Sequence, residues 1–146
     1  MRIVKMQPEH VAAVAEMERQ CFSDPWSEKS VASELDNPLS LWLIAEADGV
    51  VAGYVGSQTV LDSADMMNLA VSQDFRRQGI GEQLVNSLTE ALAEKGVKTL
   101  LLEVRISNEP AKELYQKLGF EIVGKRPRYY EKPWEDALIL RKELYA

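Results

Sequence analysis

Hydrophobic and polar positions recur along this chain with two periods, which predict an ordered series of strands and helices. Short runs rich in apolar and β-branched residues predict strands at 3–6, 41–47, 50–59, 66–71, 99–104, 120–124 and 137–140. Apolar residues spaced three or four apart predict helices that begin near Pro8, Ser27, Gly81 and Asn108. The predicted order is strand, two helices, three strands, helix, strand, helix and two strands.

Turn residues and connection rules extend this reading to a fold class. Asp48-Gly49 between two apolar runs is a strong hairpin signal, and Gly96 ends the third predicted helix. The strands at 66–71 and 99–104, with the helix between them, form a β-α-β unit, so they are expected to be parallel neighbours. We therefore predict an α/β fold with a mixed sheet, in one domain that spans residues 1–146.

Composition narrows the class of protein. The 146 residues are 46% hydrophobic and 27% charged, as in an ordinary soluble globular domain. No apolar run approaches the roughly 20 residues of a membrane helix, and the first residues lack the apolar region of a signal peptide. We therefore expect a cytoplasmic protein without membrane association. A net charge of −6 disfavours direct nucleic-acid binding and favours a basic partner.

The single cysteine and the single histidine limit the available chemistry. Cys21 can form neither a disulfide within the chain nor a cysteine metal cluster, and no metal is expected because zinc ligands occur in clusters. His10 lies in the first turn of a predicted helix, where a surface position is the simpler interpretation than a serine–histidine or cysteine–histidine pair.

A glycine-containing loop between a strand and a helix is the main candidate binding site. The loop consists of Arg76, Arg77, Gln78, Gly79, Ile80 and Gly81. Glycines let the backbone approach a ligand, and the free amides and dipole of a helix N-terminus favour anions. Two arginines can add charge-assisted hydrogen bonds. The loop therefore predicts phosphate or pyrophosphate binding, with a tight turn and solvated arginines as the alternative.

Two common nucleotide motifs do not fit this loop. A Walker A loop needs Lys-Ser or Lys-Thr after its last glycine, where Glu82 and Gln83 stand. A dinucleotide fingerprint needs a third glycine or alanine, where Leu84 stands.

The loop and several other blocks together resemble the GNAT N-acetyltransferase superfamily. The loop matches the pattern Q/R-x-x-G-x-G/A, and 108–120 resembles the block N-x-x-A-x-x-L-Y-x-x-x-G-F. Within the superfamily the chain is similar to the ribosomal-protein alanine N-acetyltransferases. The similar stretches span nearly the whole chain and are 22–27, 68–71, 102–105, 128–130 and 135–137.

This resemblance implies a central sheet that splays to admit acetyl-CoA and a direct transfer without an acyl-enzyme. It implies main-chain contacts to the pantetheine arm from Leu69, Ala70 and Val71. It implies pyrophosphate contacts from Arg76, Arg77, Gln78, Gly79, Ile80, Gly81 and Glu82, and a further cofactor contact from Asn108. Glu103 would be the proton acceptor and Tyr115 the proton donor. The acceptor would be the N-terminal alanine of small-subunit ribosomal protein eighteen, presented as a basic peptide.

The residues themselves are compatible with these roles but leave alternatives. Glu103 interrupts an apolar strand, on the same side as Arg105. Partial burial would suit it to accept a proton, and the alternative is a strand-end glutamate paired with Arg105 or a lysine. Tyr115 could be a core tyrosine, but a phenol with a pKa of about 10 can also donate to a thiolate whose thiol has a pKa of about 8.5. Asn108 could be only a helix cap. A main-chain amide near 69–71 is expected to stabilise the oxyanion.

The acceptor can be considered in the same way. An α-amine has a pKa of about 7.7–8.0, against about 10.4 for lysine, so it loses its proton more easily. Candidate peptide contacts are Phe22, Pro25, Trp26, Tyr129 and Tyr130, for each of which ordinary packing is the alternative. Two rival functions remain: an acetyltransferase of the same fold acting on a lysine or small amine, and a non-catalytic acyl-CoA- or nucleotide-binding module.

Overall fold

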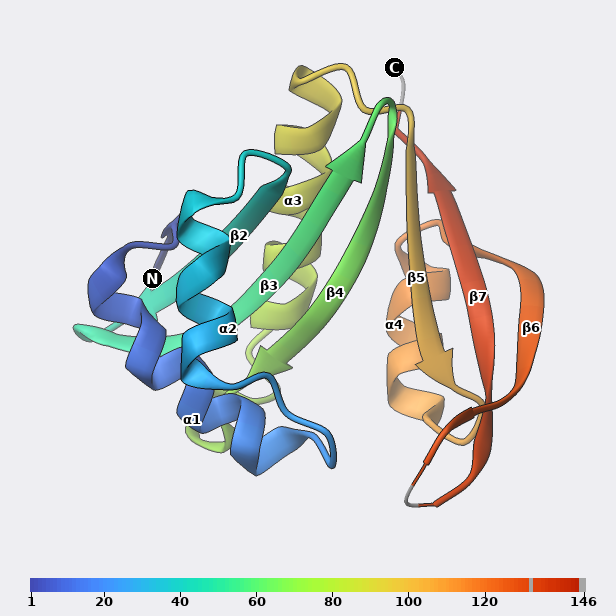
Figure 1. Cartoon of the computed structure of the whole chain (residues 1–146), viewed down its shortest axis with the longest axis horizontal. Coiled ribbons are helices and arrows are strands. Elements are labelled where there is room, and N and C mark those ends of the chain that lie inside the picture. Colours follow the sequence, from blue (N-terminus) through green and yellow to red (C-terminus); the bar gives the residue numbers. More distant parts are fainter. Residues whose placement is uncertain (132, 145–146) are drawn as a thin grey trace.

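The computed structural model describes residues 1–131 and 133–144, in which a seven-stranded mixed sheet carries helices on both faces (Figure 1). The strands are β1 Arg2–Lys5, β2 Ser40–Ala47, β3 Val50–Val60, β4 Ser63–Val71, β5 Thr99–Arg105, β6 Glu121–Tyr130 and β7 Glu135–Glu143. The α-helices are α1 Val11–Cys21, α2 Glu28–Ser33, α3 Ile80–Glu94 and α4 Glu109–Lys117. The predicted α/β class is confirmed. None of the helices in 1–131 and 133–144 has the length and apolarity needed to cross a bilayer.

The sheet is split between its two parallel strands. The strand order is β1-β2-β3-β4-β5-β7-β6, and β4 pairs with β5 only over Ser63–Asp65 and Thr99–Leu101. Beyond these residues β4 stays with β3 while β5 stays with β7, and the two halves of the sheet diverge (Figure 1). The predicted parallel pair and splayed sheet are confirmed, but the expectation that residues 66–71 pair with the strand at 99–104 is wrong. The tight turn between β3 and β4 places Val60 opposite Ser63, so β4 begins three residues before the predicted strand. Only these first three residues, Ser63–Asp65, pair with β5.

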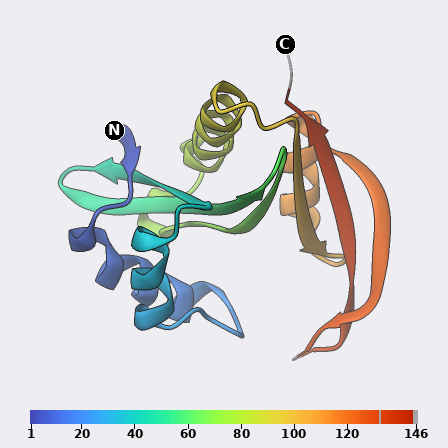
Figure 2. The same cartoon turned by 45° about the horizontal axis from the view of Figure 1, so that its top comes forward.

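The helices divide the apolar core between the two faces of the sheet (Figure 2). The buried residues of α3, together with Tyr115 on α4, pack against alternate residues of β5, namely Leu100, Leu102 and Val104. A second buried cluster joins α1 and α2 to the opposite face of β2 and β3. Because side chains alternate along a strand, Glu103 and Arg105 point to the side of the sheet that carries α1 and α2.

A β-bulge interrupts β4 where the strand borders the gap. Val55 on β3 pairs with Leu69, but Ser57 pairs with Met66, so β4 has one extra residue between these positions. A bulge of this kind bends its strand and changes the direction of main-chain groups.

A buried carboxylate anchors this bulge. Glu18 on α1 is fully buried and accepts hydrogen bonds from the Asn68 amide at 2.8 Å and from the main-chain N–H of Trp26 at 2.9 Å. The Tyr54 hydroxyl also donates to Glu18. These bonds satisfy the buried charge and fix α1, the bulge and the loop between α1 and α2 to one another.

The expectation that His10 lies on the surface is wrong. A 3-10 turn, Pro8–His10, precedes α1 and places the His10 ring against β2. The ring is buried, its Nδ1 accepts the main-chain N–H of Gln7 at 2.9 Å, and its Nε2 lies 3.0 Å from a Glu46 carboxylate oxygen. His10 is therefore a structural residue at the sheet edge.

Candidate active site

A cavity of about 390 Å³ opens between the loop that precedes α3 and the first turns of α4. Predicted cofactor residues that line it are Val71, Arg76, Arg77, Gly79, Ile80, Gly81 and Glu82. Residues that the sequence did not single out as cofactor contacts also line it: Phe75, Pro110, Ala111 and Leu114. The small size of Pro110 and Ala111 in the first turn of α4 was the one sequence feature that could have indicated a cavity there. Only the packing of α4 beside α3 brings these residues to the loop.

The N-terminus of α3 presents main-chain donors at this cavity. Gly79 is the N-cap with a φ of +76°, and no side chain caps the helix. The main-chain bond from Gln83 to the Gly79 carbonyl, at 3.1 Å, starts the ladder, so the amides of Ile80, Gly81 and Glu82 precede it. Ile80 buries its side chain in the core, which leaves its main chain for the cavity. Such an arrangement favours an anion.

The two arginines of the loop have different positions. The Arg76 Nε donates to the Val71 carbonyl at 3.2 Å, and its Nη2 lies 3.9 Å from the Cys21 sulfur. Arg76 is therefore held against the end of β4, and Cys21, although distant in sequence, is next to the loop. Arg77 is exposed with a left-handed φ of +66°. Gln78 is also exposed, but does not line the cavity.

The end of β4 directs main-chain groups to the gap, and the Val71 carbonyl among them is already bonded to Arg76. Ser72 donates to the Ala52 carbonyl at 2.8 Å, so Ala70, two residues earlier, also bonds toward β3. In an antiparallel pair the intervening residues direct their main-chain groups to the other side. Leu69 and Val71 therefore direct theirs toward the gap that β5 has left.

Tyr115 spans the gap from α4. Its hydroxyl lies 3.7 Å from the Met66 sulfur on β4, one residue beyond the last pair with β5, and its ring packs edge-on against Phe120. Burial, with a smaller contribution from Tyr130, raises the pKa of the phenol above its usual value near 10. The ordinary phenol pKa of about 10 is therefore too low for Tyr115, and the phenol keeps its proton well into the alkaline range.

Glu103 occupies the opposite side of β5. Its Oε1 lies 3.3 Å from the Arg126 Nε, and no residue of the described chain donates to its buried Oε2. The glutamate is thus paired with an arginine of β6, not with Arg105 or a lysine as the alternative interpretation expected. One carboxylate oxygen stays available as an acceptor, next to the gap.

Tyr130 connects the environments of these two groups. Burial and the charge of Glu103 raise the pKa of Tyr130 to about 12. The same tyrosine contributes to the raised pKa of Tyr115, although Glu103 and Tyr115 lie on opposite faces of β5. The two predicted side chains therefore border the same strand, β5, from its opposite faces.

Asn108 caps α4, as one of the two interpretations of this residue expected. Its Oδ1 accepts the main-chain N–H of Ala111 at 3.2 Å. The residue is exposed and adjoins, without lining, the cavity beside α4.

The aromatic residues proposed for the acceptor fall into two groups. Phe22 and Trp26 are partly buried against the α1–α2 core, and Trp26 packs edge-on against Trp42. Tyr129 is 51% exposed and packs edge-on against Tyr130 at 5.0 Å between ring centroids. Ordinary packing thus accounts for the first pair, whereas the tyrosines border Glu103.

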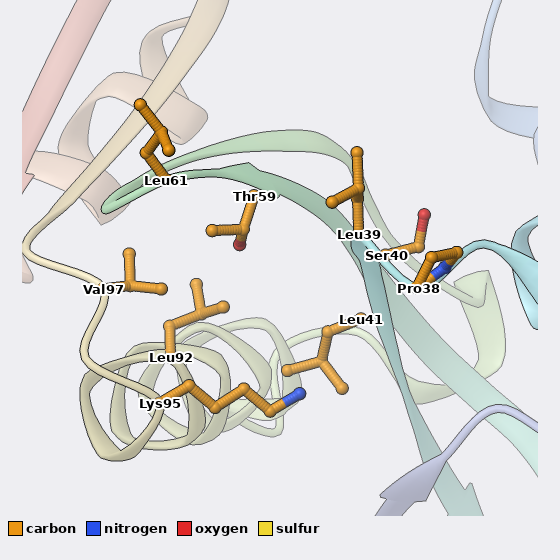
Figure 3. Close-up of a pocket in the computed structure, with 9 residues that line it drawn as sticks. All are labelled: Pro38, Leu39, Ser40, Leu41, Thr59, Leu61, Leu92, Lys95 and Val97. Carbon is orange, nitrogen blue, oxygen red and sulfur yellow. The ribbon is translucent and has the colours of Figure 1, made fainter.

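A smaller cavity of about 220 Å³ lies at the other end of α3 (Figure 3). Its lining is mainly aliphatic and includes Leu41, Leu92 and Val97, with Lys95 at its edge. It contains none of the predicted site residues. At 1.5 Å per helical residue, the length of α3 separates the two cavities by about 20 Å, so the smaller one is distinct from the candidate site.

A split mixed sheet with a glycine-capped helix start beside the split is the arrangement that the resemblance to N-acetyltransferases predicts. The chain belongs to the acetyltransferase (GNAT) family, whose model matches residues 11–120. It is 36% identical over 140 residues to the ribosomal protein bS18-alanine N-acetyltransferase of Escherichia coli strain K12, covering 94% of each chain. A Bacillus subtilis protein provisionally named for the same activity is 42% identical over 136 residues, which cover 92% of this chain and 90% of the relative.

The solved structures give the same result. The crystal structure of the ribosomal-protein-S18-alanine N-acetyltransferase from Escherichia coli superposes with a TM-score of 0.92 at 35% identity, covering 99% of this chain and 94% of that one. The chain is therefore an acyltransferase with the GNAT fold.

Proposed function

We propose that this enzyme transfers the acetyl group of acetyl-CoA to the α-amine of the N-terminal alanine of ribosomal protein bS18. The relatives named for this reaction match the chain over nearly its whole length. The observation that carries the proposal is the gap between β4 and β5, with the α3 cavity at one side and Glu103 at the other. A ribosomal substrate also implies action in the cytoplasm, without direct nucleic-acid or membrane binding.

The residues present fit acetyl-CoA. The cavity at α3 combines a glycine N-cap with main-chain amides, which suits a pyrophosphate. The main-chain edge at Leu69 and Val71, apart from the Val71 carbonyl that Arg76 holds, suits the amide-containing pantetheine arm, and Asn108 would contact the cofactor from α4. Bound there, acetyl-CoA supplies the acetyl thioester, and the protein supplies binding, orientation and proton transfer.

Glu103 would accept the proton that the acceptor amine loses, and Tyr115 would serve the thiolate that leaves from acetyl-CoA. The Glu103 Oε1 pairs with Arg126, and the Oε2, which has no hydrogen-bond partner in the described chain, can accept a proton from the acceptor amine, directly or through water. Tyr115 would donate to the thiolate that leaves. Because burial raises the pKa of Tyr115 above 10, while a model thiol has a pKa of about 8.5, a strong hydrogen bond to the thiolate is its main contribution.

The acceptor chemistry favours an α-amine over a lysine. The difference of roughly 2.5 pKa units corresponds to about 3.4 kcal/mol in the free energy of deprotonation at neutral pH. The net charge of −6 also favours the encounter with a basic ribosomal protein.

A pair of peptides tests the proposed acceptor. A peptide that carries the N-terminal sequence of bS18 and begins with alanine should gain one acetyl group at its α-amine. The same peptide with a blocked N-terminus and a free lysine should react at least about tenfold more slowly, because of the deprotonation cost. Mass spectrometry with fragment mapping measures both rates.

Each alternative has its own outcome in that experiment. Equal rates for the two peptides would replace the N-terminal acceptor by a lysine or small amine. Absence of reaction with both peptides, together with acetyl-CoA binding, would favour the non-catalytic binding module. Higher salt should reduce the association rate with the basic substrate, since screening acts beyond about 8 Å near physiological ionic strength.

Substitution of Gly81 tests the cofactor site. A Cβ at Gly81 would meet Leu114 and Val71 at 3.8 Å, an ordinary contact, so valine should fit the fold while its methyl groups occupy the cavity. Acetyl-CoA should raise the melting temperature of the wild type, because it binds the native state. Gly81→Val should lose most of this shift. The shift is measured by scanning calorimetry.

The control is Glu90→Val, an exposed residue later in α3, which should keep the full shift. An unchanged shift in Gly81→Val would remove the cavity from the proposed cofactor site. Gly79 is a less suitable position, because its φ of +76° strains any side chain whether or not a ligand binds.

A further inference from the structure

Arg105 occupies a central position on the acceptor side, meaning the side of the sheet that carries α1 and α2 and to which Glu103 points. It follows Glu103 by two residues, so both side chains leave β5 on the same face. Its side chain is only 24% exposed. Neither the proposed proton transfers nor the cofactor cavity uses this residue.

The guanidinium of Arg105 holds the turn between β6 and β7. Its Nη1 donates to the Pro133 carbonyl at 3.0 Å and to the Glu135 carboxylate at 3.1 Å, and its Nη2 donates to the Glu131 carbonyl at 2.9 Å. The same group stacks over the Tyr130 ring, 4.5 Å from its centroid. A planar fork with several donors can satisfy these partners together, which a lysine cannot do.

Glu135, which accepts from Arg105, is also bonded to the chain just after β5. The second carboxylate oxygen of Glu135 accepts the main-chain N–H of Ser107 at 3.1 Å. Hydrogen bonds from Ser107 and the adjacent Arg105 guanidinium lower the pKa of Glu135, so the carboxylate stays charged at neutral pH. The turn is thus tied to the end of β5 from two directions.

Arg105 also reaches across the split of the sheet. Its Nη2 lies 3.4 Å from the Ser23 hydroxyl, in the loop between α1 and α2. That loop and the β6–β7 turn approach each other at the open end of the gap (Figures 1 and 2). The first segment belongs to the half with β4, and the second to the half with β5.

We propose that Arg105 is a positioning residue for the acceptor peptide, because it sets the α1–α2 loop and the β6–β7 turn at a fixed separation beside Glu103. Both segments border the side from which an amine must approach Glu103. The cofactor cavity, in contrast, is built from β4, α3 and α4 and contains no partner of Arg105. Loss of the guanidinium therefore affects acceptor binding selectively. This inference rests on the proposed transfer to a peptide α-amine.

Steady-state kinetics of Arg105→Met and Arg105→Lys test the inference. Both variants should raise the KM for the alanine peptide by about tenfold or more, since small displacements of positioning groups cost up to about a hundredfold. The dissociation constant for acetyl-CoA should change less than twofold. Lysine should not restore the peptide KM, because it cannot form the fork of hydrogen bonds. The matched control is Arg141→Met, which removes an exposed ion pair with Glu143 on β7 and should leave both constants unchanged.

Two milder variants keep the test decisive if Arg105→Met folds poorly. Glu135→Gln weakens the turn, and Ser23→Ala removes only the contact across the split; both should raise the peptide KM in the same direction by a smaller factor. A peptide KM equal to the wild type in all four variants, measured below their melting temperatures, would overturn the positioning role. A parallel loss of acetyl-CoA affinity would also overturn it. A wild type that leaves the peptide unmodified would instead contradict the proposed function.

Discussion

Glu103→Gln is expected to slow acetyl transfer by about a hundredfold to ten-thousandfold at pH 7, the usual contribution of a general base. Glutamine keeps the shape of the side chain and can still meet Arg126, but it cannot accept a proton. Single-turnover rates with saturating peptide and acetyl-CoA measure this effect on the chemical step. Acetyl-CoA affinity should stay near the wild-type value, because the cavity at α3 does not include Glu103.

The pH dependence of this variant sharpens the test. An α-amine has a pKa of about 7.7–8.0, so raising the pH toward 9 supplies deprotonated acceptor without a base. The deficit of Glu103→Gln relative to the wild type should therefore shrink as the pH rises. Glu121→Gln, an exposed substitution on β6, is the matched control and should behave as the wild type. Wild-type rates in Glu103→Gln at pH 7 would remove Glu103 from the reaction.

Tyr115→Phe is expected to reduce the single-turnover rate by about a hundredfold or more, because the leaving thiolate loses the hydrogen bond from the phenol that stabilises it. The substitution preserves the ring that packs against Phe120 and removes only the hydroxyl near the Met66 sulfur. Stability and acetyl-CoA affinity should change little. A rate within threefold of the wild type would show that another group serves the thiolate.

The raised pKa of Tyr115 adds a prediction with a definite sign. Burial keeps the phenol protonated beyond pH 10, so the wild-type rate should not fall between pH 8 and 10 through ionisation of this group. A group whose folded-state pKa is raised contributes stability that is complete below its unfolded pKa of about 10 and is lost as the pH rises further. The free energy of unfolding should therefore decline above pH 10, and less steeply in Tyr115→Phe, as denaturant titrations can measure.

The order of elements follows from local sequence pattern. Apolar periodicity and turn residues such as Asp48-Gly49 act within a few residues, so they predicted every strand and α-helix of the described chain in the right order. Their ends were less well predicted where pairing decides them. β6 runs to Tyr130 because it pairs with β7, and β7 runs to Glu143 because its last residues pair with β5, so both ladders extend beyond the apolar runs.

The candidate cofactor loop was also readable locally. Gly79 precedes α3 and Gly81 lies in its first turn, and the main-chain amides of such a helix start favour anions. The roles of Glu103 and Tyr115 could be proposed from the family resemblance, and their assignment to the chemistry remains a prediction. Side-chain partners were not readable, as the attachment of Arg76 to the Val71 carbonyl illustrates.

The sequence by itself determined the element order, the glycine-containing loop at the start of α3 and the common side of β5 that Glu103 and Arg105 share, because each depends on neighbours within about one turn or one strand. Only the tertiary structure decided how far β4 and β5 pair before they part, how burial raises the pKa of Tyr115, and which partners meet Glu103 and Arg105. These features join residues that are far apart in the chain. Their contacts depend on packing and register across the whole sheet, and no local pattern encodes them.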